Sequence, residues 1–209
     1  MLIVGLTGSI GMGKSTAAAH LRARGLPVFD ADAEVHRLYA GGKAVDPVER
    51  AFPGTTTHGV VDRAKLSAVL VANPARFREL EAIVHPLVRE SERAFLREHA
   101  AHGAEIAVLE VPLLFETGAD KLVDVTIVVS AAPEVQRARM LTRPGMSAEK
   151  LDRLLSRQVP DAEKRAAADF VVDTSLDIET SQAALDTALA ELRGRPGEAY
   201  ARHWAKHAT

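Results

Sequence analysis

Three short apolar runs stand out along the chain because their hydrophobic residues are continuous rather than alternating. They occupy Leu2–Leu6, Ile106–Val111 and Val125–Val129. Runs of this kind, rich in Val, Ile and Leu, are typical of parallel strands that are covered on both faces. Weaker apolar runs at Leu26–Phe29 and Phe170–Val172 predict two further strands.

Stretches that predict helices lie between these runs. They are Lys14–Arg24, Ala33–Tyr39, Arg63–Ala72, Pro74–Ala101, Pro133–Leu141 and Ile178–Leu192. Strands that alternate with helices predict a three-layer α/β fold with a parallel sheet.

The alternation is interrupted between about residues 33 and 103, where the pattern is mostly helical and a Gly-, Pro- and Thr-rich patch occupies Gly41–Gly59. An inserted helical subdomain explains this interruption. We therefore expect a single domain over 1–209, with its core at about 1–32 and 104–209 and the insertion at about 33–103.

Individual residues predict where some helices begin and end. Asn73 before Pro74 predicts a helix start, with a capping residue followed by proline at the first helical position. Pro86 predicts that the next helix ends or kinks near His85. Residues 194–209 lose the strand pattern and predict a partly ordered tail.

Composition narrows the class of protein. The chain has 26 Lys and Arg against 28 Asp and Glu, a net charge of −2, and nine aromatic residues among 209, which argues against nucleic-acid binding. It has no cysteine, which excludes disulfides and thiolate chemistry and suits a reducing compartment. No run reaches 18 uncharged apolar residues. We therefore expect a soluble cytoplasmic protein with no nucleic-acid or membrane partner, while its oligomeric state stays open.

The sharpest chemical signal is the sequence Gly8–Ser15, which satisfies the phosphate-loop pattern G-x-x-x-x-G-K-[ST] between an apolar run and a helix. Glycines allow backbone N–H groups to turn towards phosphate oxygens, and the following helix directs its positive end at the same anion. Lys14 would reach the β- and γ-phosphates of a nucleotide, and the Ser15 hydroxyl would bind Mg²⁺. The pattern identifies a nucleotide and leaves the reaction open.

Two carboxylates, Asp30 and Asp32, follow the second expected strand. Carboxyl ends of parallel strands meet at the edge where ligands bind, so both are expected near the phosphate loop. A kinase that acts on an alcohol needs a carboxylate to accept the hydroxyl proton, and Asp32 is the candidate base. The alternative, a capping residue for the helix that begins near Ala33, is equally compatible with the spacing.

Arginines would stabilise charge on the transferred phosphoryl group. Arg137, Arg139 and Arg143 cluster at one helix end, and Arg139 and Arg143, four residues apart, are expected on one helix face. The pattern indicates a basic lid at about 139–160, against the alternative of a solvated charged surface. Further cations follow at Arg153, Arg157 and Lys164.

Glu110 ends the third strand run and is a candidate to hold Mg²⁺ through water, while the apolar residues Pro112–Phe115 either belong to the core or line a substrate pocket. His85 on its own is more often structural. No His/Asp/Glu set has the spacing of a metal site.

Taken together, these motifs resemble the dephospho-CoA kinase family. The matching elements are Leu6–Thr16, Asp30–Asp32, Val84–Leu87 and Val111–Glu116, followed in order by Arg139 with Arg143, Arg157–Gln158 and Ala168–Asp169. The chain departs from the family at Val172–Ser175, where an Asn-Gly-type turn is usual. The resemblance implies a P-loop nucleotide-binding core with a helical substrate-binding insertion and a mobile lid.

The resemblance also implies an activity and the residues that carry it. The activity is ATP-dependent phosphorylation of the 3′-hydroxyl of dephospho-CoA, the last step of coenzyme A synthesis, with Mg²⁺. By position, Asp32, Lys14 and Arg139 are the expected catalytic residues. The ATP site is expected at Gly11, Met12, Gly13, Lys14, Ser15, Thr16 and Arg143, with Ser15 on the metal. The substrate side is expected at Thr7, Asp32, His85, Pro112 and Leu113.

Two other function classes stay in view. One is a different P-loop small-molecule kinase, acting on a nucleoside or nucleotide. The other is a nucleotide-dependent switch protein, although the chain has no N-K-x-D run of the kind that recognises guanine.

Overall fold

The computed structural model describes residues 1–205 of the 209-residue chain. They form two compact units: Met1–Phe29 with the chain from Leu96 onward, and Asp30–Phe95. We call these the sheet unit and the helical unit. Each has its own hydrophobic core.

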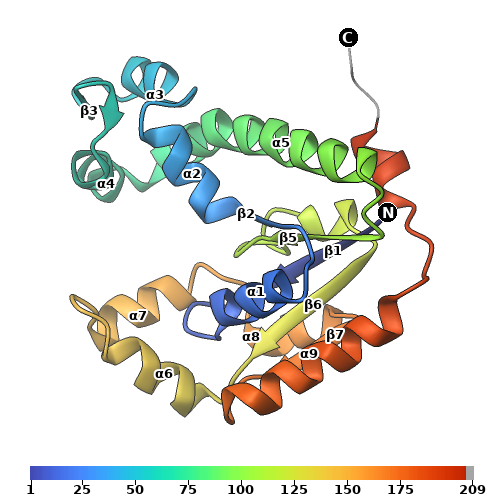
Figure 1. Cartoon of the computed structure of the whole chain (residues 1–209). Coiled ribbons are helices and arrows are strands. Elements are labelled where there is room, and N and C mark those ends of the chain that lie inside the picture. Colours follow the sequence, from blue (N-terminus) through green and yellow to red (C-terminus); the bar gives the residue numbers. More distant parts are fainter. Residues whose placement is uncertain (206–209) are drawn as a thin grey trace. The chain divides into compact units, whose positions relative to one another are not determined.

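A five-stranded sheet lies at the centre of the sheet unit, as far as the described residues show (Figure 1). In spatial order its strands are β2 (Val28–Asp30), β5 (Ile106–Glu110), β1 (Leu2–Thr7), β6 (Val125–Ser130) and β7 (Phe170–Asp173). β1 pairs in parallel with β5 and β6, and β6 with β7. Each strand lies within two residues of its apolar run in the sequence, so the predicted parallel sheet is confirmed.

Successive side chains of the buried central strand, β1, point to opposite faces of the sheet. Leu2, Val4 and Leu6 of β1 join the core formed with α1 (Lys14–Ala23) and α9 (Ile178–Leu192), which lie side by side (Figure 1). Ile3 and Thr7, at the alternate positions of β1, are also fully buried, as a sheet covered on both faces requires. The other described helices of this unit are α6 (Pro133–Leu141), α7 (Ala148–Leu155), α8 (Asp161–Ala167), the end of α5, the 3₁₀ turn Ala119–Leu122 and the short helical segment Tyr200–Trp204.

An ion-pair cluster joins α1 to α9. Asp186 on α9 accepts a hydrogen bond from Nε of Arg24 at 2.9 Å, and its Oδ1 lies 2.9 Å from Nε2 of His20. The hydrogen bond from Arg24 holds the pKa of the Asp186 carboxyl below its usual range, with His20 as a further contributor.

The helical unit contains α2 (Ala31–Tyr39), α3 (Val45–Ala51), α4 (Arg63–Ala72) and most of α5 (Phe77–Ala101). Their apolar faces form its core. Its fully buried members include Leu38, Ala44, Val48 and Phe52. A hairpin of β3 (Thr56–Thr57) and β4 (Val60–Val61) also lies here and was not predicted, because two-residue strands are too short to show a period.

Two predictions about helix ends in this unit have mixed outcomes. Helix α5 runs on for 25 residues through Pro86, so the expectation that it ends at His85 is wrong, while the alternative of a kink there stays a prediction. Proline removes one hydrogen bond, and Pro86 is exposed, so packing on both sides of it maintains the helix. The helical start expected at Asn73 and Pro74 is present, because Pro74 opens a short 3₁₀ turn (Pro74–Arg76) before α5, but Asn73 makes no side-chain cap.

The segment after α9 is ordered through residue 205, so the prediction of a partly ordered tail is wrong for this part. Asp124 accepts hydrogen bonds from the N–H groups of Glu198 and Ala199, both at 2.7 Å. Trp204, buried in the short helical segment Tyr200–Trp204, donates from Nε1 to the Leu122 carbonyl at 2.8 Å. These single distant anchors leave no periodic signal in the sequence. Residues 206–209 of the predicted tail lie outside the described residues.

Within residues 1–205, no helix is both long enough and apolar enough to cross a lipid bilayer.

Candidate functional site

A glycine-rich loop joins β1 to α1 at the carboxyl edge of the sheet. Gly11 and Gly13 have φ values of 81° and 84°, in the left-handed region that glycine adopts without strain. No side chain caps the first turn of α1 at Gly13, so its first backbone N–H groups are left for an anion. The local geometry therefore agrees with the phosphate loop read from the sequence.

Close packing against β6 and α6 gives this loop its shape. The buried Met12 accepts a hydrogen bond at Sδ from the N–H of Ala131 at 3.0 Å. A Cβ added to Gly11 would lie 2.7 Å from Cγ of Met140, and one added to Gly8 would lie 2.6 Å from the Val129 carbonyl oxygen. A larger residue at either glycine would displace the loop or its neighbours.

Lys14, the first residue of α1, forms an ion pair with Glu110 at the end of β5, at 2.9 Å between Nζ and Oε1. Arg22 lies 3.4 Å from the second carboxylate oxygen. Glu110 is only 2% exposed, and the two cations balance its buried charge. The lysine of the phosphate loop is thereby held at the carboxyl edge of the sheet.

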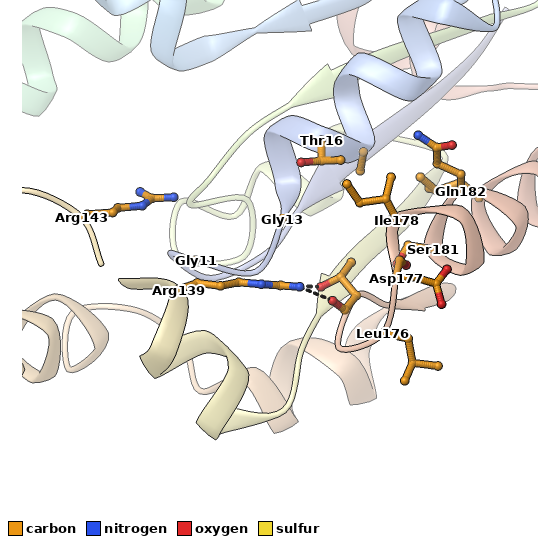
Figure 2. A pocket seen from close by; sticks show the side chains of 13 residues that line it. Gly11, Gly13, Thr16, Arg139, Arg143, Leu176, Asp177, Ile178, Ser181 and Gln182 are labelled. Atoms are coloured by element: carbon orange, nitrogen blue, oxygen red, sulfur yellow. Dashed lines mark hydrogen bonds between the residues drawn. The ribbon is translucent and has the colours of Figure 1, made fainter. Parts of the chain in front are cut away.

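A cavity of about 310 Å³ adjoins the loop, and its walls come from α1, α6 and the start of α9 (Figure 2). Gly11, Gly13 and Thr16 line one side, and Arg139 and Arg143 another. The structure therefore brings four of the predicted ATP-site residues and the predicted catalytic residue Arg139 to one cavity. In Figure 2 the Arg139 guanidinium points across the cavity towards the chain that precedes Leu176.

Arg139 is held by the residue that follows β7. Its Nη2 donates to the Thr174 carbonyl at 2.6 Å and its Nη1 to the Thr174 hydroxyl oxygen at 3.4 Å. The same hydroxyl donates towards the carbonyls of Met12, at 2.9 Å, and Ser130, at 3.1 Å. Thr174 thus links the loop, the sheet and Arg139.

The prediction that Arg139 and Arg143 share a helix face is wrong, because α6 ends at Leu141 and Arg143 lies in the turn beyond it. The residues line the same cavity nevertheless. Pro144 and Gly145 follow directly and end the helical pattern.

Sequence reasoning missed the far wall of the cavity. Leu176 and Ile178 are apolar yet 65% and 57% exposed, and they lie at the cavity with polar neighbours. The sequence signal for these residues was weak, because two aliphatic residues at the start of a helix usually predict a position in the hydrophobic core. The lining residues that were not predicted are Ala17, Thr174, Leu176, Asp177, Ile178, Ser181, Gln182 and Leu185.

Thr7 and the residues after β5 lie together on the sheet unit. The buried Thr7 donates from its hydroxyl to the Pro112 carbonyl at 3.2 Å. Leu113 is exposed, whereas Leu114 is buried and would lie 2.9 Å from a Cβ added to Gly5. The run Pro112–Phe115 is therefore divided: Leu114 belongs to the core, whereas Leu113 lies on accessible surface.

Asp30, rather than Asp32, caps α2. Its Oδ1 accepts the N–H of Ala33 at 2.9 Å, because α2 begins at Ala31, two residues earlier than predicted. Asp32 lies in the first turn of α2. Its side chain is exposed and does not cap the helix, because Asp30 does. The cap alternative for Asp32 is therefore wrong.

His85 lies on α5 of the helical unit and is exposed. In the same unit, the carboxylate of Glu34 accepts hydrogen bonds from Arg37 at 2.6 and 2.8 Å and from the Ser91 hydroxyl. The Arg37 guanidinium holds the pKa of Glu34 below its usual value. The hydrogen bond from Ser91 to Glu34 joins α5 to α2, the helix that carries Asp32.

The cations expected on the lid have different roles. Arg137 forms an exposed pair with Asp152 at 3.1 Å. Lys164, by contrast, is fully buried, and its Nζ lies 2.7 Å from Oε1 of Glu116 without hydrogen-bond geometry. Burial of the whole side chain rules out Lys164 as a lid cation, and makes it a structural partner of Glu116.

The oxygen groups near the loop suit Mg²⁺ better than a softer metal. Ser15 is exposed in the first turn of α1, and Glu110 offers a carboxylate at the adjacent strand end. Among residues 1–205 no three His, Cys, Asp or Glu side chains form a metal cage. A nucleotide-borne Mg²⁺ needs few protein ligands, because phosphates and water supply the rest.

Comparison with known proteins agrees with this geometry. Residues 2–180 match the family model described as Dephospho-CoA kinase. The dephospho-CoA kinase of Mesorhizobium japonicum is 54% identical over 94% of this chain and 100% of its own, and that of Rhizobium meliloti is 55% identical over 92% and 99%. The crystal structure of TT1252 from Thermus thermophilus superposes with a TM-score of 0.79 at 38% identity, covering 92% of this chain and 98% of that one. With its P-loop fold and a family match across most of its length, the chain belongs to the dephospho-CoA kinase family.

Proposed function

We propose that this protein transfers the γ-phosphoryl group of ATP to the 3′-hydroxyl of dephospho-CoA, giving coenzyme A and ADP, in the cytoplasm. The observation that carries the proposal is the phosphate loop, with Lys14 held at the strand edge and a two-arginine cavity beside it, in a chain of this family. The absence of cysteine suits a reducing cytoplasm.

The phosphate loop binds the ATP phosphates through Gly11, Met12, Gly13, Lys14, Ser15 and Thr16. Backbone N–H groups and the positive end of α1 supply the contacts that need no side chain. Lys14 exchanges its carboxylate partner, Glu110, for the β- and γ-phosphates, and the short Lys14–Glu110 distance supports this because it keeps the ammonium group at the loop. The cavity wall at Leu176 and Ile178 offers apolar surface to the base.

Asp32 accepts the proton of the attacking 3′-hydroxyl. Its exposure and its freedom from the capping role support this assignment. We assign the substrate side to Thr7, His85, Pro112 and Leu113, and the substrate-binding insertion to the helical region at about 33–103.

Arg139 and Arg143 neutralise charge that develops on the transferred phosphoryl group. The hydrogen bonds from Arg139 to Thr174 support this role, because a donor held in advance needs little reorganisation during the reaction. The segment at about 139–160, which carries both, is the proposed lid.

Ser15 would hold Mg²⁺, with Glu110 reaching it through water. When bound, the ion would supply positive charge that neutralises the phosphate oxygens of ATP. The chain's own residues then orient the two substrates and exclude water from the transfer.

A purified-protein assay tests the proposal. ATP consumption should rise with dephospho-CoA and not with AMP, shikimate or nucleosides. Stimulation by a nucleoside or AMP instead would indicate another small-molecule kinase, and stimulation by no acceptor would favour a nucleotide switch. Either result contradicts the proposal.

Variants test the proposed roles. Asp32→Asn should lower kcat by about 10²–10⁴-fold with the ATP affinity nearly unchanged, as expected for a proton acceptor. Glu134→Gln, at an exposed carboxylate in the first turn of α6, is the matched control and should behave as wild type. Loss of ATP binding in Asp32→Asn would instead mean that Asp32 is structural.

A further inference from the structure

Two glutamine side chains bind the backbone of one residue in the phosphate loop. The N–H of Ile10 donates to Oε1 of Gln158 at 3.3 Å. The carbonyl of Ile10 accepts from Nε2 of Gln136 at 2.7 Å. Both backbone groups of Ile10, between Gly8 and Gly13 in the loop, therefore have side-chain partners far away in the sequence.

These glutamines flank the arginine-bearing segment. Gln136 lies in α6, and Gln158 lies three residues after the end of α7 at Leu155. The segment 137–157 between them carries Arg139 and Arg143 of the cavity. The two ends of this segment are thus bonded to the same residue of the phosphate loop.

The surrounding structure fixes the position of each glutamine. Gln136 is 7% exposed, and its Cγ would lie 3.4 Å from a Cβ added to Gly11, so α6 packs directly on the loop. Next to Gln158, the N–H of Val159 donates to Glu116 at 2.9 Å, and Glu116 is paired with the buried Lys164. Packing therefore positions Gln136, and the neighbouring hydrogen bond of Val159 positions the backbone next to Gln158.

The chemistry at the two positions is opposite. An N–H group only donates and a carbonyl only accepts, so Gln158 must present its oxygen to Ile10 and Gln136 must present its nitrogen. A glutamate at 158 keeps the acceptor, whereas a glutamate at 136 loses the donor. This asymmetry allows the two contacts to be tested separately.

We propose that Gln136 and Gln158 are positioning residues that hold the phosphate loop in register with the arginine-bearing segment 137–157, so that the loop and Arg139 act on the same phosphoryl group. The inference rests on the proposed use of the loop for ATP. Neither glutamine needs to touch a substrate.

Hydrogen exchange of the Ile10 amide, measured on the full chain without nucleotide, tests the contact itself. In Gln158→Met, which keeps the length of the side chain, exchange at Ile10 should rise about threefold or more, the effect of one lost hydrogen bond. Gln158→Glu should retain the protection because it keeps the acceptor. Gln136→Met should raise the exchange less, because Gln136 binds the carbonyl.

Steady-state kinetics test the positioning role. Gln136→Met and Gln158→Met should each lower kcat about three- to tenfold, with the KM for dephospho-CoA within about twofold of wild type. Glu134→Met on α6 and Glu163→Met on α8 place the same side chain at exposed positions outside the proposed lid, and should match wild type. If Gln136→Met does not fold, the partly exposed Gln158 decides the outcome alone.

The results separate two kinds of failure. Unchanged exchange at Ile10 in Gln158→Met, or raised exchange with unchanged kcat, overturns the positioning proposal. A wild-type chain that does not phosphorylate dephospho-CoA refutes the proposed function instead. In that case the positioning proposal is tested by the Kd for ATP instead of kcat. It then requires that Gln158→Met binds ATP at least threefold more weakly than wild type.

Discussion

The glycine at position 11 offers a sharp test of how the phosphate loop is held. Gly11 and Gly25 have nearly the same φ, 81° and 82°, in the left-handed region. A Cβ on Gly11 would lie 2.7 Å from Cγ and 3.0 Å from Sδ of Met140, whereas a Cβ on Gly25 would meet nothing within 4 Å. Alanine at the two positions therefore shares one effect, backbone strain, and differs in the other, steric overlap.

The magnitudes follow from these two effects. Alanine in the left-handed region is less stable than glycine by about 1 kcal/mol, which is the expected destabilisation for Gly25→Ala. Met140 is fully buried and has little room to move, so overpacking adds about 1–3 kcal/mol at Gly11. Gly11→Ala should therefore lower the free energy of unfolding by about 2–4 kcal/mol.

Urea unfolding followed by tryptophan fluorescence measures this difference. The chain has one tryptophan, Trp204, buried in the sheet unit, so its emission reports the unit that contains the loop. In a Met140→Ala background, Gly11→Ala should cause only the smaller loss, because the overlapping atoms are gone. Equal losses for Gly11→Ala and Gly25→Ala, or no relief by Met140→Ala, would refute the packing argument.

Three further predictions concern other contacts. Thr174→Val should lower kcat about three- to tenfold by removing the hydroxyl link to the loop and Arg139, whereas Thr174→Ser should restore it; equal rates in the two variants would exclude the link. Lys164→Met should destabilise the sheet unit by about 3–5 kcal/mol, because Glu116 is left as an unpaired buried charge, and adding Glu116→Gln should recover part of the loss in urea unfolding. The pKa of Asp186 is lowered, so its ionised form stabilises the fold above the ordinary carboxyl pKa and that contribution is lost as the pH falls through the lowered value. Asp186→Asn should lower the stability by about 0.5–1 kcal/mol at neutral pH, with the Tm difference vanishing in acid; a pH-independent difference would contradict the ionic origin.

The architecture of the sheet unit could be predicted because its signals are continuous and local. Runs such as Val125–Val129 are apolar without alternation, which strands covered on both faces require. The hairpin at Thr56–Val61 could not, since its turn has positive φ at His58 and Gly59, and His-Gly is not a usual turn signal. The ordered segment ending at Trp204 depends on long-range contacts with Leu122 and Asp124 that no local pattern announces.

In the candidate site, too, local features could be predicted from the sequence and long-range contacts could not. The phosphate loop could be read from spacing, because its chemistry demands glycines and a lysine in a fixed order. The pairing of Lys14 with Glu110, and the link of Thr174 to Arg139, join residues 96 and 35 positions apart and depend on strand order. Lys164 was misassigned for the same reason, since a sequence does not show that a cation is buried.

The measurement that tests the central claim most directly is ³¹P NMR of the reaction of the purified chain with ATP and dephospho-CoA. The account predicts one ADP for each dephospho-CoA consumed and a new phosphomonoester on the ribose 3′-carbon. ATP hydrolysis without consumption of dephospho-CoA, or a phosphate at another position, would contradict it.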